Sequence, residues 1–225
     1  MPVNVPRIAV VDYGMGNLFS VKRACEQVGL AAEVTQSREI ILNSDGVILP
    51  GVGAFGDAMS ILETLDLISV LQDVAASGRP IVGICLGMQL LMSESAEFGS
   101  HRGLGIIDGE VVRLPERSSN DERVKVPHVG WDRIQATRVW SETLLEGLSD
   151  GAFMYFVHSY YPLPAAKEIE LSRSRYGSTE FCSSFQRGNI FGCQFHPERS
   201  GGHGLEIYGK LAEAVGLKAE RKSHV

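Results

Sequence analysis

Short apolar runs alternate with segments of helical periodicity along the first hundred residues. Four runs rich in Val, Ile and Leu predict buried strands, at residues 8–11, 32–35, 46–49 and 81–84. Between them, apolar residues recur every three to four positions, which predicts helices at residues 17–27, 57–77 (with a break near Asp66) and 86–93. Short apolar strands separated by helices are typical of a parallel sheet that helices cover on both faces.

The rhythm changes after about residue 105, where apolar runs follow one another across short connections. These runs predict strands at residues 111–112, 124–126, 131–136, 153–157, 169–175, 181–186 and 190–194, and a last helix at 205–215. We expect this half to be mixed or antiparallel and to pack on the same core. The sequence therefore predicts an α/β fold with one domain, residues 1–216, in which helices cover both faces of a mostly parallel or mixed, flavodoxin-like sheet. Residues 217–225 are polar and are expected to form a tail.

Composition and charge narrow the classes of partner. The 225 residues carry 21 Lys and Arg against 27 Asp and Glu, a formal net charge of −6, and contain no basic tract, so we expect no nucleic-acid partner. No apolar run approaches about 18 residues, and residues 1–7 lack the pattern of a secretory signal. We therefore expect no membrane partner and a cytoplasmic location. The four cysteines are not spaced as in a zinc ribbon, and we expect neither a metal nor a cofactor.

The sharpest local signal is Gly83-Ile84-Cys85-Leu86-Gly87, between a predicted strand and a predicted helix. This G-x-C-x-G pattern is the thiol counterpart of the nucleophile elbow, a strained turn that projects the reactive atom above the edge of the sheet. The two glycines remove Cβ atoms that would collide in so tight a turn. A cysteine at a helix N-terminus is also favoured as the thiolate. Cys85 is therefore the candidate nucleophile.

A cysteine nucleophile needs a base, and the base needs a group that orients it. His196 and Glu198 follow the predicted strand 190–194, in a strand-end position where α/β sheets place their sites. Pro197 between them imposes an extended backbone, so the carboxylate can turn to one imidazole nitrogen and leave the other for the thiol. His196 is the candidate base, and Glu198 the candidate orienting group.

A tetrahedral intermediate also needs two donors for its oxyanion. The backbone N–H of Leu86, directly after the nucleophile, can supply one. The turn that follows the neighbouring predicted strand, at Val52 and Gly53, can supply the other because its glycines let the peptide plane rotate.

These residues resemble the class I glutamine amidotransferases, whose Cys-His-Glu triad matches Cys85, His196 and Glu198. Within that class the chain is similar to the glutaminase subunits of imidazole glycerol phosphate synthase, over about residues 8–215. The matching motifs are residues 12–18 (DYGMGNL), 49–55 (LPGVGAF), 83–91 (GICLGMQLL), 127–131 (PHVGW), 155–160 (YFVHSY) and 192–201 (GCQFHPERSG).

The resemblance implies hydrolysis of L-glutamine to glutamate and ammonia through a cysteine thioester. Gln89 and the backbone around Ser159 and Tyr160 match positions that hold the substrate glutamine in the family. It also implies that ammonia passes to a (β/α)₈-barrel cyclase subunit in a heterodimer, which makes imidazole glycerol phosphate and an aminoimidazole carboxamide ribotide in histidine biosynthesis.

The resemblance further implies a partner surface and a control of activity. Asn17, Trp131, Tyr155 and Arg199 match family positions that contact the cyclase. Family members of this kind are nearly idle until the partner is liganded. The physical interpretation is that the peptide before Val52 is not aimed at the oxyanion until the interface shifts it.

Asp132 departs from the family, which commonly has Asn after the Gly-Trp pair. A carboxylate cannot donate hydrogen bonds as an amide does, so the contacts behind Trp131 are in doubt. The departure also leaves the alternative that the chain is a paralogue that feeds ammonia to another synthase, such as one that amidates surface sugars. A stand-alone cysteine hydrolase or peptidase and a scaffold with a relic site compete with these hypotheses. Gln89 and Glu198 count against the hydrolase, and the complete triad counts against the relic.

Overall fold

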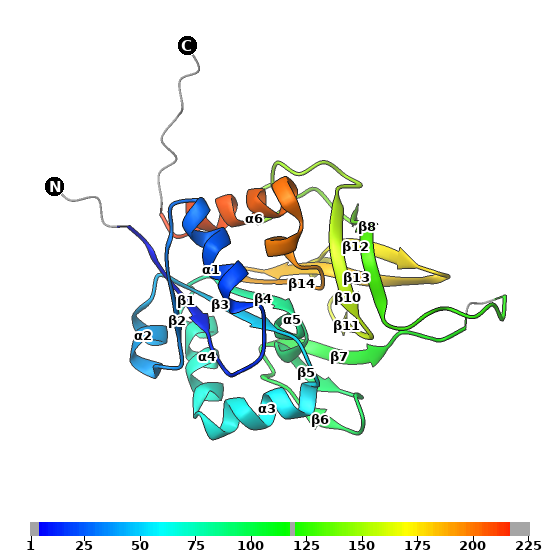
Figure 1. Ribbon diagram of the computed structural model, residues 1–225, viewed down its shortest axis with the longest axis horizontal. Helices are drawn as coiled ribbons and strands as arrows, with labels where there is room; N and C mark the ends of the chain where they lie inside the picture. The colour runs from blue at the N-terminus through cyan, green and yellow to red at the C-terminus, as the bar shows by residue number, and fades with distance from the viewer. Residues whose placement is uncertain (1–4, 118–119, 217–225) are drawn as a thin grey trace, which may run out of the picture.

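A computed structural model describes residues 5–117 and 120–216, and the expected tail at 217–225 lies outside the described residues. Its main sheet has eight strands in the order β2-β1-β3-β4-β14-β13-β12-β9 (Figure 1). The first five in this order pair in parallel. They are β2 (Ala31–Thr35), β1 (Arg7–Val11), β3 (Gly46–Gly51), β4 (Ile81–Cys85) and β14 (Ile190–Cys193). The predicted α/β class is therefore confirmed.

The second half of the chain extends this sheet with antiparallel strands and adds two smaller sheets. The antiparallel extension consists of β13 (Thr179–Arg187), β12 (Glu170–Tyr176) and β9 (Gln135–Ala136). A two-stranded sheet pairs β8 (His128–Arg133) with β10 (Phe153–His158). A four-stranded sheet contains β11 (Tyr160–Pro164), β7 (Ile107–Arg113), β5 (Met92–Ser95) and β6 (His101–Arg102).

Helices cover both faces of the main sheet because its parallel strands are apolar on both sides. Ile8 and Val10 of β1 pack with α1 (Leu18–Gln27) and α6 (Gly201–Ala214) on one face. Ala9 and Val11 pack on the other face with α2 (Arg38–Asn43), α3 (Phe55–Thr64), α4 (Leu67–Ala76) and α5 (Leu86–Leu90) (Figure 1). Within the described ranges, no helix is long and apolar enough to span a membrane.

Some element boundaries differ from those that the apolar pattern predicts. The predicted helix at 86–93 ends at Leu90, because Met92–Ser95 forms β5 and pairs with β7. Residues 124–126 form no strand, and the apolar pattern does not predict α2. The break near Asp66 is confirmed, since this residue has a φ of 53° between α3 and α4. The early end of the helix therefore lies where a partner strand, and not local periodicity, decides the conformation.

Gly87 sets how closely α5 can approach β3. A Cβ built on Gly87 would overlap the carbonyl oxygen of Leu49, and one on Gly83 would lie 2.8 Å from the carbonyl oxygen of Gly87. The turn between β4 and α5 therefore requires that neither position carries a side chain.

We expect Gly87→Ala to lower the free energy of unfolding by more than about 2 kcal/mol, because backbone, and not a flexible side chain, occupies the space of the new methyl group. Urea denaturation followed by circular dichroism measures this change. The control is Gly209→Ala in α6, where a Cβ meets no atom within 4 Å. This variant should keep or slightly raise stability, by up to about 1 kcal/mol. Equal stability of the two variants would contradict the steric argument.

Candidate active site

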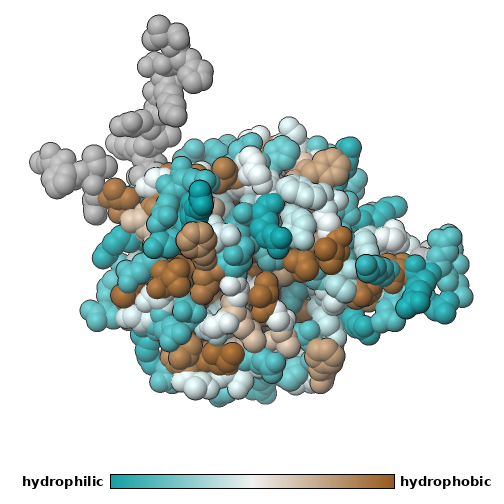
Figure 2. Space-filling model, in the orientation of Figure 1, coloured by the Kyte–Doolittle hydropathy of each residue, from teal (hydrophilic) through white to brown (hydrophobic). Residues whose placement is uncertain are grey.

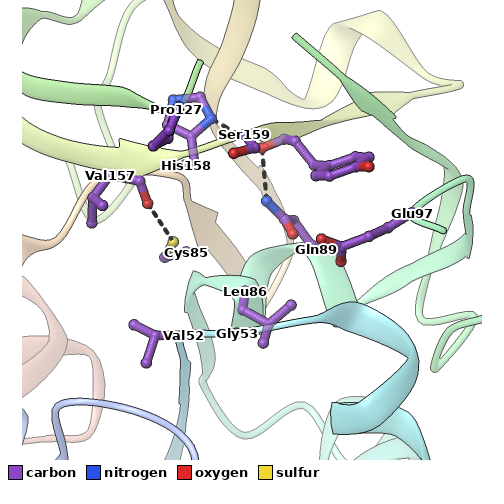
Figure 3. Close-up of a pocket in the computed structure, with 11 residues that line it drawn as sticks. Val52, Gly53, Cys85, Leu86, Gln89, Glu97, Pro127, Val157, His158 and Ser159 are labelled. Carbon is purple, nitrogen blue, oxygen red and sulfur yellow. Dashed lines mark hydrogen bonds between the residues drawn. The ribbon is translucent and has the colours of Figure 1, made fainter. Parts of the chain in front are cut away.

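Cys85 lies at the carboxyl end of β4 with a backbone conformation that few side chains adopt. Its φ is 54° and its ψ is −109°. Such strain persists only where the surrounding structure imposes it, and here the close packing of Gly83 and Gly87 does so. The side chain lines a cavity of about 230 Å³ together with Val52, Leu86 and the buried Gln89 (Figure 3). The predicted elbow is thus present, and its sulfur faces a space that a small ligand can enter.

Two polar groups contact the Cys85 sulfur directly. Gln194 Nε2 donates to Sγ at 3.5 Å, and Sγ lies 3.6 Å from the carbonyl oxygen of Val157 (Figure 3 shows the second contact). Gln194 is fully buried at the end of β14. The sequence analysis does not single out this residue, although it stands two positions before His196. Its buried amide contacts the nucleophile, which indicates a role in the site.

His196 and Glu198 meet as the spacing across Pro197 predicts. His196 Nδ1 lies 2.8 Å from Glu198 Oε1, and the two side chains are only 4% and 1% exposed. The His196 N–H donates to the carbonyl oxygen of Tyr155 at 2.9 Å, and Ser200 Oγ donates to the His196 carbonyl at 2.7 Å. These bonds hold the η2 turn (Pro197–Arg199) against β10. The carboxylate therefore fixes the orientation of the imidazole.

The charge of His196 results from opposing effects. Burial lowers its pKa, but the negative charge of the Cys85 thiolate, followed by the hydrogen bond and charge of the Glu198 carboxylate, outweighs burial and raises the pKa to about 10. Nε2 is buried, and it has no hydrogen-bond partner within the described part of the chain. Glu198 therefore holds Nδ1, and Nε2 is the ring nitrogen left for the Cys85 sulfur.

The predicted oxyanion donors lie beside the nucleophile. β3 pairs with β4 so that Gly51 is opposite Cys85, which places Val52 and Gly53 at the same edge as the sulfur. The hydroxyl of Tyr13 donates to the Pro50 carbonyl at 2.7 Å and holds the end of β3. Gly53 has a φ of 122°, a conformation suited to glycine. Leu86 begins α5 directly after Cys85, so both predicted donor peptides border the cavity.

The predicted substrate-binding residues line the same cavity and are linked by hydrogen bonds. Gln89 Nε2 donates to the Tyr160 carbonyl at 2.8 Å and to Gln194 Oε1 at 3.0 Å. Ser159 also borders the cavity, between Tyr160 and the end of β10. Gln89 thereby connects the Tyr160 backbone to the amide that contacts Cys85.

Glu97 also lines this cavity, and the motifs do not single it out. Its Oε2 accepts from the Phe55 N–H at 2.6 Å, and burial raises the pKa of its carboxyl while that hydrogen bond lowers it. It follows β5, a strand in a segment whose local pattern predicts helix, so its approach to the site could not be derived from that pattern.

Comparison with known proteins identifies the family of this arrangement. The family model for "Glutamine amidotransferase class-I" matches residues 9–209. The chain belongs to the class I glutamine amidotransferase family. This result confirms the resemblance that the six motifs indicate.

Several relatives of this amidotransferase carry the name "Imidazole glycerol phosphate synthase subunit HisH". The protein of Moorella thermoacetica is 47% identical over 92% of this chain and 95% of its own length. That of Aquifex aeolicus is 45% identical over 96% of this chain and 98% of its own length. A solved structure of PurLQS from Thermotoga maritima, 17% identical, superposes with a TM-score of 0.69 over 93% of this chain and 98% of that chain, which supports the fold alone.

Two buried histidines of the amidotransferase brace the backbone at Tyr160. His158 Nδ1 lies 2.9 Å from the Tyr160 carbonyl, an acceptor, so Nδ1 carries the proton and Nε2 accepts from His128 Nδ1 at 3.2 Å. Burial, then the neighbouring His128, lowers the pKa of His158 to about 3, so this ring stays neutral. The pair therefore fixes the carbonyl that also holds Gln89.

Asp132 extends this pair toward the surface. Its Oδ1 accepts from the Arg133 N–H at 2.8 Å, and its Oδ2 lies 3.6 Å from His128 Nε2. Burial lowers the pKa of His128, and the Asp132 charge raises it in part. The residue that departs from the family thus contacts the backbone of Arg133 and faces a histidine.

Three of the four predicted partner-contact residues form a cluster at the surface, in which the two aromatic rings meet edge to face and Tyr155 is half-buried. The rings of Trp131 and Tyr155 lie 6.0 Å apart on β8 and β10, and the Arg199 guanidinium lies 4.5 Å from the centre of the Tyr155 ring. Trp131 is 55% exposed and is not a core residue. Asn17 occupies the N-cap position of α1 but its side chain makes no capping hydrogen bond. A broken band of apolar side chains crosses this face, over the start of α1 and the β8–β10 pair (Figure 2).

We expect alkylation of the native protein by iodoacetamide to modify Cys85 before any other cysteine. Burial raises the pKa of Cys25 to about 12 and of Cys182 and Cys193 well above the usual value, so these thiols stay protonated. Peptide mass mapping after partial labelling identifies the modified site. Cys85→Ser is the control and should take up label only after denaturation. Prior labelling at one of the other three cysteines would show that Cys85 is not the reactive thiol.

Proposed function

We propose that this amidotransferase is the glutaminase subunit of an imidazole glycerol phosphate synthase and works in the cytoplasm. The observation that carries the proposal is the assembly of Cys85, His196 and Glu198 at one edge of the sheet, beside a cavity of about 230 Å³. The relatives named as subunits of that synthase cover nearly the whole chain, which supports the choice of reaction.

In the proposed mechanism, the Cys85 thiolate attacks the side-chain carboxamide carbon of glutamine. The tetrahedral intermediate collapses when the C–N bond breaks, and His196 gives its proton to the departing ammonia. The neutral imidazole then takes a proton from water, whose oxygen attacks the γ-glutamyl thioester. Cleavage of the C–S bond releases glutamate and regenerates the thiolate. Glu198 holds His196 in one orientation through Nδ1 during both steps.

Backbone donors stabilise the oxyanion of both tetrahedral intermediates. The Leu86 N–H follows the nucleophile directly, and the peptides at Val52 and Gly53 lie at the end of the adjacent strand. A second donor of this kind contributes about 3 kcal/mol of transition-state stabilisation. Because Val52 is 44% exposed, a bound partner can reach this peptide and turn its N–H toward the oxyanion.

The cavity offers complementary groups for a free amino acid. Both hydrogen bonds that fix Gln89 use Nε2, so Oε1 is the amide atom that can accept from the substrate carboxamide. The backbone at Ser159 and Tyr160 borders the same space, and the Glu97 carboxylate can pair with the α-ammonium group. These contacts select glutamine over a peptide, because a peptide bond would remove the ammonium charge.

The proposed partner is a (β/α)₈-barrel cyclase subunit, bound in a heterodimer. Its proposed contact surface is the cluster of Trp131, Tyr155 and Arg199, together with Asn17 at the start of α1. Aromatic and arginine side chains dominate the energetics of protein interfaces. The His196 N–H bonds to the Tyr155 carbonyl, so this surface adjoins the triad. Ammonia released at Cys85 therefore leaves close to the proposed interface.

The proposal predicts little glutamate release from glutamine by the purified chain and strong stimulation when a cyclase subunit and its nucleotide ligand are added. Cys85→Ser should abolish glutamine-dependent synthesis by the complex and leave synthesis from added ammonia intact, because the cyclase chemistry lies on the other subunit. Coupled assays with either nitrogen source measure both activities. Vigorous release by the chain alone, cleavage of peptides, or loss of both syntheses would overturn the assignment.

Trp131→Ala should weaken binding of the cyclase subunit by more than about fivefold, since central aromatic residues contribute more than about 1 kcal/mol. Isothermal titration calorimetry measures the affinity. The control is Val139→Ala, which removes an apolar group that is 79% exposed and outside the β8–β10 pair. Affinity unchanged by Trp131→Ala would exclude this surface as the interface.

A further inference from the structure

Two buried oxygen atoms on the side of the triad away from the sulfur lack hydrogen-bond partners. They are Glu198 Oε2 and the hydroxyl of Tyr208, and neither is paired within the residues that the structure describes. Glu198 uses only Oε1 to hold His196. An unpaired buried donor or acceptor costs about 1 to 3 kcal/mol, so two of opposite kind in one region call for a common explanation.

The packing of α6 directs Tyr208 toward Glu198. This helix begins at Gly201, directly after the η2 turn that carries Glu198 (Figure 1). A Cβ on Gly204 would overlap the Pro197 carbonyl, so the helix lies directly against that turn. Tyr208 stands one helical turn after Gly204 and on the same buried face. Side chains on a helix lean toward its N-terminus, so the Tyr208 ring extends over Gly204 toward η2.

The electrostatics agree with this placement. Burial raises the pKa of Tyr208 well above its usual value, and the Glu198 charge is the next largest cause. The hydroxyl therefore keeps its proton and can only be a donor toward a carboxylate. The other titratable groups near it are Cys25 of α1 and Cys193 of β14, whose pKa values burial also raises, so both stay neutral thiols. Arg23 of α1 lines a small cavity together with Glu198.

We propose that Tyr208 is a positioning residue of the triad, whose hydroxyl donates to Glu198 Oε2 through one bridging water molecule. This inference rests on the proposed glutaminase function and deepens it. With both oxygens engaged, the carboxylate cannot rotate away from the imidazole. His196 therefore retains its proton on Nδ1 and presents Nε2 to the sulfur.

The test is Tyr208→Phe, which removes only the hydroxyl and keeps the ring in the core. Its control is Tyr161→Phe, a buried tyrosine that packs against Phe181. Both variants are assayed for glutamine hydrolysis in complex with the liganded cyclase. We expect Tyr208→Phe to lower kcat about tenfold, as for loss of a hydrogen bond to a charged group, with KM for glutamine unchanged. Tyr161→Phe should leave both constants unchanged.

A double-mutant cycle separates positioning from simple packing. In a Glu198→Gln background, Tyr208→Phe should have little further effect, because the two changes act on one hydrogen-bonded unit.

Two results would overturn the inference. One is a Tyr208→Phe variant with the wild-type kcat. The other is a Tyr208→Phe change that lowers kcat by the same factor in the wild-type and the Glu198→Gln backgrounds. Synthesis from added ammonia should be unchanged in all variants, which verifies that the complex is intact. If the wild-type complex itself released no glutamate from glutamine, the proposed function would fail, and not the assignment of Tyr208.

Discussion

The strained backbone of Cys85 is the constraint on which the site depends. A positive φ at a residue with a side chain costs about 1 to 3 kcal/mol, and the close contact of α5 with β3 and β4 imposes it here. In an ordinary strand the side chain would point to the face of the sheet opposite to Ile84. Because of the strain it faces a cavity at the strand end. The close contact between Leu49 and Gly87 thus fixes the position of the Cys85 sulfur.

The remaining groups are arranged around that fixed atom by the convergence of strand ends. β3 brings Val52 to one side, and β14 brings Gln194 and the imidazole to another. The influence of Cys85 and Glu198 on the pKa of His196 outweighs the penalty of its burial. The imidazole is oriented by Glu198 before substrate binds, so little reorganisation is needed during the reaction.

The sequence predicts the nucleophile, the base and the parallel half of the sheet because each depends on short-range patterns. The turn around Cys85 is encoded within five residues, and His196 and Glu198 are separated by one proline. The contributions of Gln194, Glu97 and Tyr208 could not be predicted in this way, since each reaches the site through tertiary packing. β5 shows the same limit: its first two residues lie in the predicted helix 86–93, but pairing with β7 makes them part of a strand. Asp132 stands out in the sequence as a departure, yet its position facing His128 follows only from the β8–β10 register.

The β8–β10 pair forms a ribbon of its own outside the main sheet, and this has a mechanical consequence. Two carbonyls of β10 serve the catalytic groups: that of Tyr155 accepts from the His196 backbone, and that of Val157 contacts the Cys85 sulfur. The opposite strand carries Trp131, more than half exposed. Narrow ribbons twist more readily than wide sheets. A force that twists β8 at Trp131 would therefore move the Tyr155 and Val157 carbonyls together, because both belong to the strand paired with it.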